Sequence, residues 1–178
     1  MMNAMSFIDL LRSRRSVRKY KTRPLSREIG DLLAEALLRS PSSRDTESWE
    51  FIFVDDPELL RKLAKAKPAG AEFLAKAALA IVIMGNERNT DVWTEDCSIA
   101  AIISQLAAHD LGLGSCWAQI RLRPHDRATT AEAYLQELLG IPKNYRVNMI
   151  VGVGYPDEFP EPVPKEAVDL GKIRHNRF

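Results

Sequence analysis

Apolar residues recur with the period of an α-helix in several segments of this chain. The clearest follows Ser26, which can act as an N-cap with Glu28 in the first turn. Its apolar positions have the i, i+3, i+4, i+7, i+8 spacing of one helix face: Ile29, Leu32, Leu33, Ala36 and Leu37. Shorter helices are expected over residues 6–14, 58–66 and 130–139.

Other segments have the periodicity of β-strands. Residues 49–54 alternate and are rich in aromatic and branched side chains. Residues 79–84 are apolar throughout, which indicates a strand buried on both faces. Residues 115–120 and 147–156 are also expected to be extended, whereas the proline-rich residues 157–165 are expected to be irregular.

Residues 95–111 are apolar on nearly every side of a predicted helix. They contain a stripe of large residues, Ile99, Ile102, Ile103 and Leu106, and a set of small ones, Ala100, Ala101, Ala107 and Ala108. A helix with this pattern is buried, either in a large core or between subunits. Gly112 is expected to end it.

The order of these elements indicates an α+β fold. Helices and strands interleave, but the strands are few for a doubly wound sheet and the helices are many. The chain has 178 residues and a mass of 20.0 kDa, so we expect residues 1–178 to form a single domain.

Composition narrows the class of protein further. Hydrophobic residues make up 46% and charged residues 28%, as in ordinary globular proteins. No apolar run approaches the roughly 20 residues of a membrane span, and residues 1–5 lack the basic start of a signal peptide. We therefore expect a soluble, cytoplasmic protein that does not interact with membranes. Cys97 and Cys116 form no disulfide framework or metal motif.

Basic residues are concentrated near the start of the chain. From Arg12 to Arg23 there are seven of them and no acidic residue, although the formal net charge of the whole chain is only +1. Such a run is often a solvated face. Nucleic-acid binding is disfavoured, because the pI of about 7.8 shows no basic excess over the domain. The phosphate of a small cofactor is a better match, because it needs only a few guanidinium groups, a hydroxyl and free backbone amides.

Five motifs together resemble the nitroreductase family of flavin enzymes. They are RRSVRKY, PSS followed by WEF, GLGSCW, LGIPKNYRVNMIVGVGYPDE and KIRHNRF. The resemblance implies one FMN-binding domain with a central mixed sheet flanked by helices, in an intertwined homodimer with two cofactor sites at the subunit interface. It also implies oxidation of NADH or NADPH, with electrons passed to a nitroaromatic, a quinone or a similar small acceptor by a ping-pong mechanism.

The resemblance also assigns cofactor-binding residues. Arg14, Arg15 and Ser16 would hold the FMN phosphate and ribityl chain, and Arg18 would reach the pyrimidine side of the flavin, where positive charge stabilises the reduced ring. The other assigned residues are Pro41, Ser42 and Ser43, in a loop that reaches the flavin of the other subunit; Trp117, Ala118 and Gln119, in a loop along the ring with an amide facing N5; and Lys172 and Arg174, as further phosphate contacts. An ordinary turn at residues 41–43 and a core role for Trp117 remain alternatives.

The chain departs from the family pattern at two places. Asp45 and Glu47 stand where family members often have amides, and Arg174-His175 stands where they often have His-Tyr. The two carboxylates are expected to disfavour anionic acceptors, unless they only cap the turn before Trp49.

No catalytic side chain and no metal site is expected. The three histidines, His109, His125 and His175, fit no metal-ligand spacing. In flavin enzymes the cofactor carries the hydride, so the absence of a catalytic side chain is compatible with activity. A flavin-binding protein for storage or sensing, or a specialised flavin enzyme of the same fold, remains the alternative function.

Overall fold

The computed structural model describes residues 6–178, so the expectation for residues 1–5 lies outside the described part of the chain. All the expected helices and strands are present, with bounds close to those expected. They are α1 (Phe7–Ser13), α2 (Arg27–Leu38), β1 (Trp49–Val54), α3 (Pro57–Leu63), β2 (Leu79–Asn86), α4 (Trp93–Asp110), β3 (Gly114–Gln119), α5 (Ala131–Leu139) and β4 (Tyr145–Gly154).

Local chemistry explains where the helices begin and end. The hydroxyl of Ser26 accepts a hydrogen bond from the Ile29 amide at 3.3 Å and so caps α2, as expected. Gly112 follows α4 with a φ of +74° and Gly140 follows α5 with a φ of +67°. This left-handed conformation is favourable for glycine, so both residues end their helices.

The four strands form one sheet in the order β1-β2-β4-β3. All three strand pairs are antiparallel, so the expectation of a mixed sheet is wrong for these strands. A parallel contact exists only as an isolated bridge between Ser16 and Ser115, among residues 6–178. Strand direction depends on pairing between distant segments, so it cannot be predicted from the periodicity of each segment.

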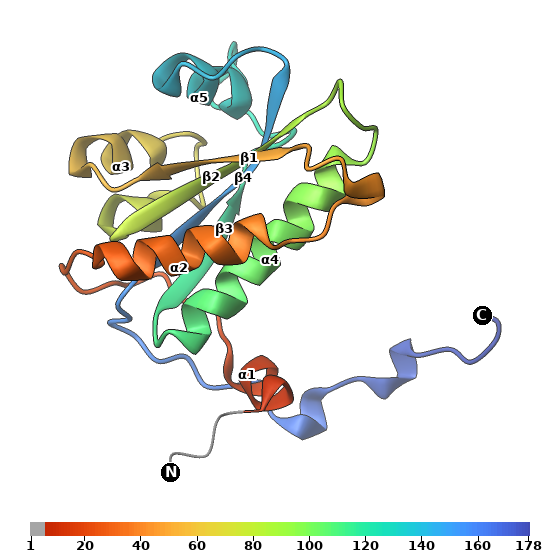
Figure 1. Cartoon of the computed structure of the whole chain (residues 1–178). Coiled ribbons are helices and arrows are strands. Elements are labelled where there is room, and N and C mark those ends of the chain that lie inside the picture. The colour runs from red at the N-terminus through yellow and green to blue at the C-terminus, as the bar shows by residue number, and fades with distance from the viewer. Residues whose placement is uncertain (1–5) are drawn as a thin grey trace.

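Two hydrophobic cores lie on the two faces of the sheet (Figure 1). One includes Leu60 and Leu63 of α3 and Leu135 of α5. The other includes Leu33 and Leu37 of α2 together with small residues of α4. Strands β2 and β4 are buried between these cores, whereas β1 and β3 form the edges of the sheet.

Helix α4 packs on the sheet through its small residues. Ala100, Ala101 and Ala108 are buried, while Ile99 and Ile102 remain 39% and 42% exposed. Small side chains let the helix approach the sheet closely, and the large isoleucines consequently point away from it. Ile99 and Ile102 are therefore not packed into either hydrophobic core of the single chain.

The C-terminal segment is irregular, as expected. It contains only two short 3₁₀ turns, η3 (Lys165–Ala167) and η4 (Leu170–Lys172), and residues 161–178 are exposed. Figure 1 shows this segment extending away from the sheet. Among residues 6–178 no helix combines the length and the apolar character needed to cross a membrane.

Candidate functional site

The basic segment is fixed against one end of the sheet. Ser16 bridges to Ser115 of β3, and the Val17 amide donates to the Ser115 carbonyl at 2.9 Å. The buried Tyr20 hydroxyl lies 2.6 Å from the Val17 carbonyl oxygen and 3.1 Å from that of Gly152. Because these bonds are buried, the backbone between α1 and Tyr20 holds its arginines in place.

Two glycines allow the segment to approach the sheet this closely. A Cβ atom on Gly114 would lie 2.6 Å from Val17 Cγ1, and one on Gly154 would lie 3.0 Å from the Tyr20 ring. Real Cβ atoms essentially never come as close as the first of these distances. Gly114 is thus required for the contact between β3 and the basic segment.

The arginines of the segment keep their charge available. Arg14 and Arg15 are half-buried and Arg18 is exposed. No ion pair within residues 6–178 includes any of the three. The nearby carboxylate of Glu158 accepts backbone N–H groups instead, from Arg18 at 2.6 Å and from Lys19 at 3.2 Å. The site can therefore accept an external anion.

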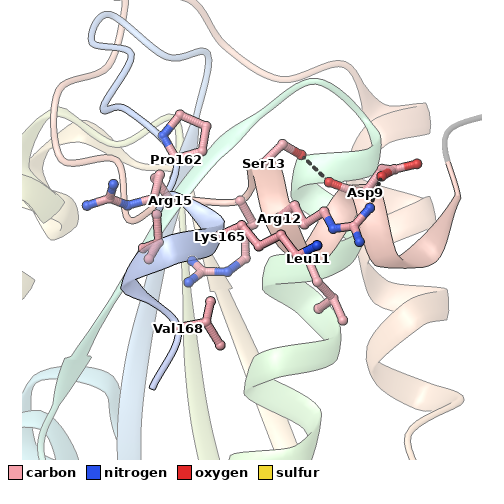
Figure 2. Close-up of a pocket in the computed structure, with 10 residues that line it drawn as sticks. Asp9, Leu11, Arg12, Ser13, Arg15, Pro162, Lys165 and Val168 are labelled. Carbon is pink, nitrogen blue, oxygen red and sulfur yellow. Dashed lines mark hydrogen bonds and ion pairs between the residues drawn. The ribbon is translucent and has the colours of Figure 1, made fainter. Parts of the chain in front are cut away.

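A hollow of about 540 Å³ lies beside this segment, between α1 and the C-terminal segment. It is lined by Asp9, Leu11, Arg12, Ser13, Arg14, Arg15, Pro162, Val163, Lys165 and Val168. Figure 2 shows Arg12 paired with Asp9. The hollow is also lined by Arg14, Arg15 and Lys165, and no ion pair within residues 6–178 includes any of these three. Sequence reasoning missed Lys165, whose only signal was a positive charge within the proline-rich segment.

A smaller hollow of about 240 Å³ is also lined by Arg15 and includes His109. His109 Nε2 is 2.9 Å from the Ser13 hydroxyl, which ties the end of α1 to the last turn of α4. Burial and the charge of Arg14 lower the pKa of His109. The neutral imidazole is therefore favoured near pH 7, and the positive charge of the site comes from the arginines.

Trp117, Ala118 and Gln119 lie in the edge strand β3, not in a loop. The Ser115 carbonyl points away from β4, toward Val17, and the Ile120 amide points toward β4. Backbone groups alternate along a strand, so the amides of Trp117 and Gln119 also point away from β4. The Trp117 side chain is 46% exposed, so it is not part of the core of the single chain.

These features fit FMN. Trp117 lies two residues beyond Ser115, about 7 Å along the strand from the point where the basic segment crosses. Guanidinium groups for a phosphate and outward backbone amides for a flavin ring thus lie within the reach of one extended FMN molecule. Arg14, Arg15, Ser16 and Arg18 are brought together with Trp117 and Gln119 in a single chain.

The loop with Pro41, Ser42 and Ser43 lies elsewhere. The Ser43 amide donates to Asp96 Oδ1 at 2.9 Å, in the first turn of α4. The basic segment meets the opposite end of the same helix, at His109. Thirteen residues of α-helix separate the two points, which is about 20 Å. One chain therefore does not bring this loop to the basic segment.

Lys172 and Arg174 also lie away from the basic segment. Both are exposed, and neither lines the hollow beside it. Arg174 donates to the Gly171 carbonyl and lies 5.1 Å from the centre of the Phe178 ring. Within one chain, Lys165 is thus better placed than either residue to meet an anion at Arg14 and Arg15.

Asp45 and Glu47 are exposed in the loop before β1, with φ angles of 56° and 42°. Within residues 6–178, neither side chain accepts a hydrogen bond that would cap the turn. The turn is held by Ser42 instead, whose hydroxyl accepts the Glu47 amide at 2.9 Å. Both carboxylates are exposed to solvent, so they can repel an anion that approaches the loop.

Neither a metal-binding cluster nor an activated cysteine is found among the described residues. No cluster of His, Cys, Asp and Glu within residues 6–178 could hold a metal ion. Burial raises the pKa of Cys97 to about 12, and it also raises the pKa of Cys116. Both cysteines are thiols near neutral pH, so neither is an activated nucleophile.

The comparisons with known proteins give the same class. The sequence profile described as "Nitroreductase family" matches residues 11–71 and 65–155, and the chain belongs to this family. An "FMN-dependent Nitroreductase" from Clostridium difficile R20291 has 43% sequence identity and a TM-score of 0.95, over 97% of this chain and 100% of that one.

Two curated relatives extend the comparison. The protein named "Putative NADH dehydrogenase/NAD(P)H nitroreductase" from Archaeoglobus fulgidus is 36% identical over 85% of this chain and 86% of its own. The "NADPH-flavin oxidoreductase" of Vibrio harveyi is 27% identical over 89% of this chain and 69% of its own.

Proposed function

We propose that this protein is an FMN-dependent oxidoreductase that takes electrons from NADH or NADPH and passes them to a nitroaromatic, a quinone or a similar small acceptor. The observation that carries the proposal is the fixed set of unpaired arginines beside an edge strand with outward amides. The family and the FMN and NAD(P)H in the names of its relatives support the same cofactor and co-substrate.

The residues of the basic segment would each hold a part of FMN. Arg14, Arg15 and Ser16 contact the phosphate and the ribityl chain through charge-assisted hydrogen bonds. Arg18 lies toward the pyrimidine side, where its charge favours the reduced flavin. An outward amide of β3, at Trp117 or Gln119, donates toward N5. When bound, FMN supplies the hydride acceptance and return, so no catalytic side chain is needed.

We also propose a homodimer that shares its two flavin sites. The large side chains of α4, Ile99 and Ile102, are exposed in the single chain, which leaves an apolar face to be covered. The loop at Pro41, Ser42 and Ser43 lies too far from the basic segment to contact the same flavin within one chain. A partner chain that covers α4 could place its own loop beside that flavin. Lys172 and Arg174 remain proposed phosphate contacts in this assembly.

The acceptor and the nicotinamide would use the same flavin face in turn, which gives a ping-pong mechanism.

We also propose that residues 1–178 form a single domain and that the protein is cytoplasmic.

The test begins with the colour of the purified protein, which should be yellow with bound FMN. Stopped-flow mixing with NADH and NADPH should then bleach the flavin absorption band. A protein that takes up no FMN at saturating concentration would refute the proposal. Binding without reduction by either nucleotide would favour the storage or sensing alternative, and an acceptor screen on the reduced protein would separate a general reductase from a specialised enzyme.

A further inference from the structure

Asp96 is a buried carboxylate that the proposed chemistry does not use. It is only 2% exposed and lies in the first turn of α4. No ion pair within residues 6–178 includes it. A buried carboxylate without a cation is costly unless N–H or O–H donors replace its water. Its donors therefore indicate what the residue does.

Both donors come from the segment between α2 and β1. Oδ1 accepts the Ser43 amide at 2.9 Å, and Oδ2 accepts the Ser48 hydroxyl at 3.2 Å. Ser48 is itself buried and directly precedes β1. One carboxylate thus binds the segment at two points that enclose residues 44–47.

The enclosed residues have an unfavourable backbone. The φ angles are 53° at Arg44, 56° at Asp45 and 42° at Glu47, and none of these residues is glycine. The left-handed region is disfavoured for residues with a Cβ atom, so such a conformation persists only where the surroundings impose it. The bonds within the loop, to Ser42 and from Thr46, do not attach it to the rest of the molecule.

Two other polar contacts attach the loop among residues 6–178. Arg44 pairs with Asp91 at 2.9 Å, but both side chains are largely exposed and such pairs contribute little. The Asn86 amide donates to the Ser48 carbonyl at 2.8 Å, at the base of the loop beside β1. The buried Asp96 side chain is the contact that reaches Ser43, one of the residues assigned to the flavin.

We infer that Asp96 is a positioning residue for FMN binding. Its carboxylate holds Ser42 and Ser43 in the one conformation in which they contact the flavin held mainly by the partner chain. This inference rests on the proposed function, and it adds a residue that does not itself touch the cofactor.

The test compares FMN dissociation constants, measured by quenching of FMN fluorescence on flavin-free protein. Asp96→Ala should raise the constant by about tenfold, the effect of losing a charge-assisted hydrogen bond. Ser48→Ala, which removes only the second donor, should raise it less. Asp96→Asn should restore most of the affinity, because the amide oxygen can accept the Ser43 N–H and the amide nitrogen can donate to the Ser48 hydroxyl.

Glu132→Ala is the control for stability, although Glu132 differs from Asp96 in that it also pairs with Arg146 at 2.7 Å. Glu132 also accepts a backbone amide, that of Val147 at 2.9 Å, but it belongs to α5 on the other face of the sheet. Its loss should lower the thermal unfolding midpoint and leave the FMN constant unchanged.

The outcomes separate the two proposals. If the unmodified protein binds no FMN, the proposed function fails and the inference fails with it. If it binds FMN, and Asp96→Ala lowers only the unfolding midpoint as Glu132→Ala does, the inference is overturned while the proposed function stands. If Asp96→Ala does not fold, the FMN constant of Ser48→Ala decides the same question.

Discussion

At the scale of residues, the candidate site depends on arginines that form no ion pair within residues 6–178. Arg14, Arg15 and Arg18 carry guanidinium groups, whose planar fork of N–H donors matches the geometry of a phosphate. A guanidinium group can bind two phosphate oxygens at once, and because its planar fork is pre-organised, less side-chain entropy is lost for each hydrogen bond formed. The half-burial of Arg14 and Arg15 also weakens the screening of their charge by salt.

Arg14→Ala should weaken FMN binding by about tenfold to a hundredfold, because it removes one member of a charge-assisted hydrogen-bond set. Arg27→Ala is the matched control, since Arg27 lies on α2 in an exposed pair with Asp31 at 3.8 Å. It removes the same charge and should leave the FMN constant nearly unchanged. Similar losses in the two variants, measured by fluorescence titration, would mean that general charge and not a specific contact holds the cofactor.

Asp45 and Glu47 should tune which acceptors react. If Asp45 and Glu47 lie beside the proposed flavin site, Asp45→Asn with Glu47→Gln should raise kcat/KM for a carboxylated nitroaromatic more than for a neutral one, because two exposed negative charges are removed. The difference should shrink as salt rises, since the Debye length is about 8 Å at physiological ionic strength. Glu28→Gln with Asp31→Asn removes two charges from α2 and serves as the control. Equal changes for both acceptors would contradict a role in charge selection.

Sequence reasoning could find some of these residues and not others. The arginines stood out because a short segment held seven basic residues and no acidic one. Lys165 and Asp96 gave no such signal. Lys165 lies near Arg14, and Asp96 binds Ser43, through contacts between segments far apart in the chain. Such contacts cannot be predicted from a local sequence pattern.

At the scale of elements, periodicity predicted most of the fold. Capping residues and apolar spacing act locally, which is why Ser26 and residues 49–54 gave correct positions for α2 and β1. The direction of strand pairing and the orientation of α4 are not local properties. A helix apolar on nearly all sides could bury either stripe, and close packing on the sheet selected the alanines.

The contact between β3 and the basic segment should fail when Gly114 gains a side chain. In Gly114→Ala, the new Cβ would lie 2.6 Å from Val17 Cγ1, so the segment must move away from the strand. We expect a loss of about 1–3 kcal/mol in the free energy of unfolding, together with weaker FMN binding. Urea titration and FMN titration measure the two effects.

Gly30→Ala is the control for this substitution. A Cβ there would meet nothing within 4 Å, and Gly30 lies in the interior of α2. The change should stabilise the protein by about 0.5–1 kcal/mol and leave the FMN constant unaltered. If Gly114→Ala lowers stability but binds FMN normally, the position of the basic segment does not control the site.

At the scale of the whole molecule, the proposed flavin site would need residues from a second chain. The basic segment and the outward amides of β3 lie at one end of α4, and the loop at Ser43 lies at the other. The exposed isoleucines lie between these ends, on the same helix. A two-fold pairing through this face would be self-complementary. It would cover the apolar stripe and complete two sites with the same contacts.

Ile102→Glu tests this assembly. Ile102 is among the exposed large residues of α4, so the single chain should tolerate the change, but an interface would have to bury an unpaired carboxylate. Sedimentation should report twice the monomer mass for the unmodified protein and the monomer mass for the variant. FMN binding should weaken along with the dimer, because the loop at Ser43 of a second chain is lost.

Ala133→Glu is the control. It adds the same charge to an exposed position of α5, and this variant should remain a dimer with bound FMN. An Ile102→Glu monomer that keeps the full FMN affinity would refute the shared site, and an unmodified protein that sediments as a monomer would refute the dimer itself.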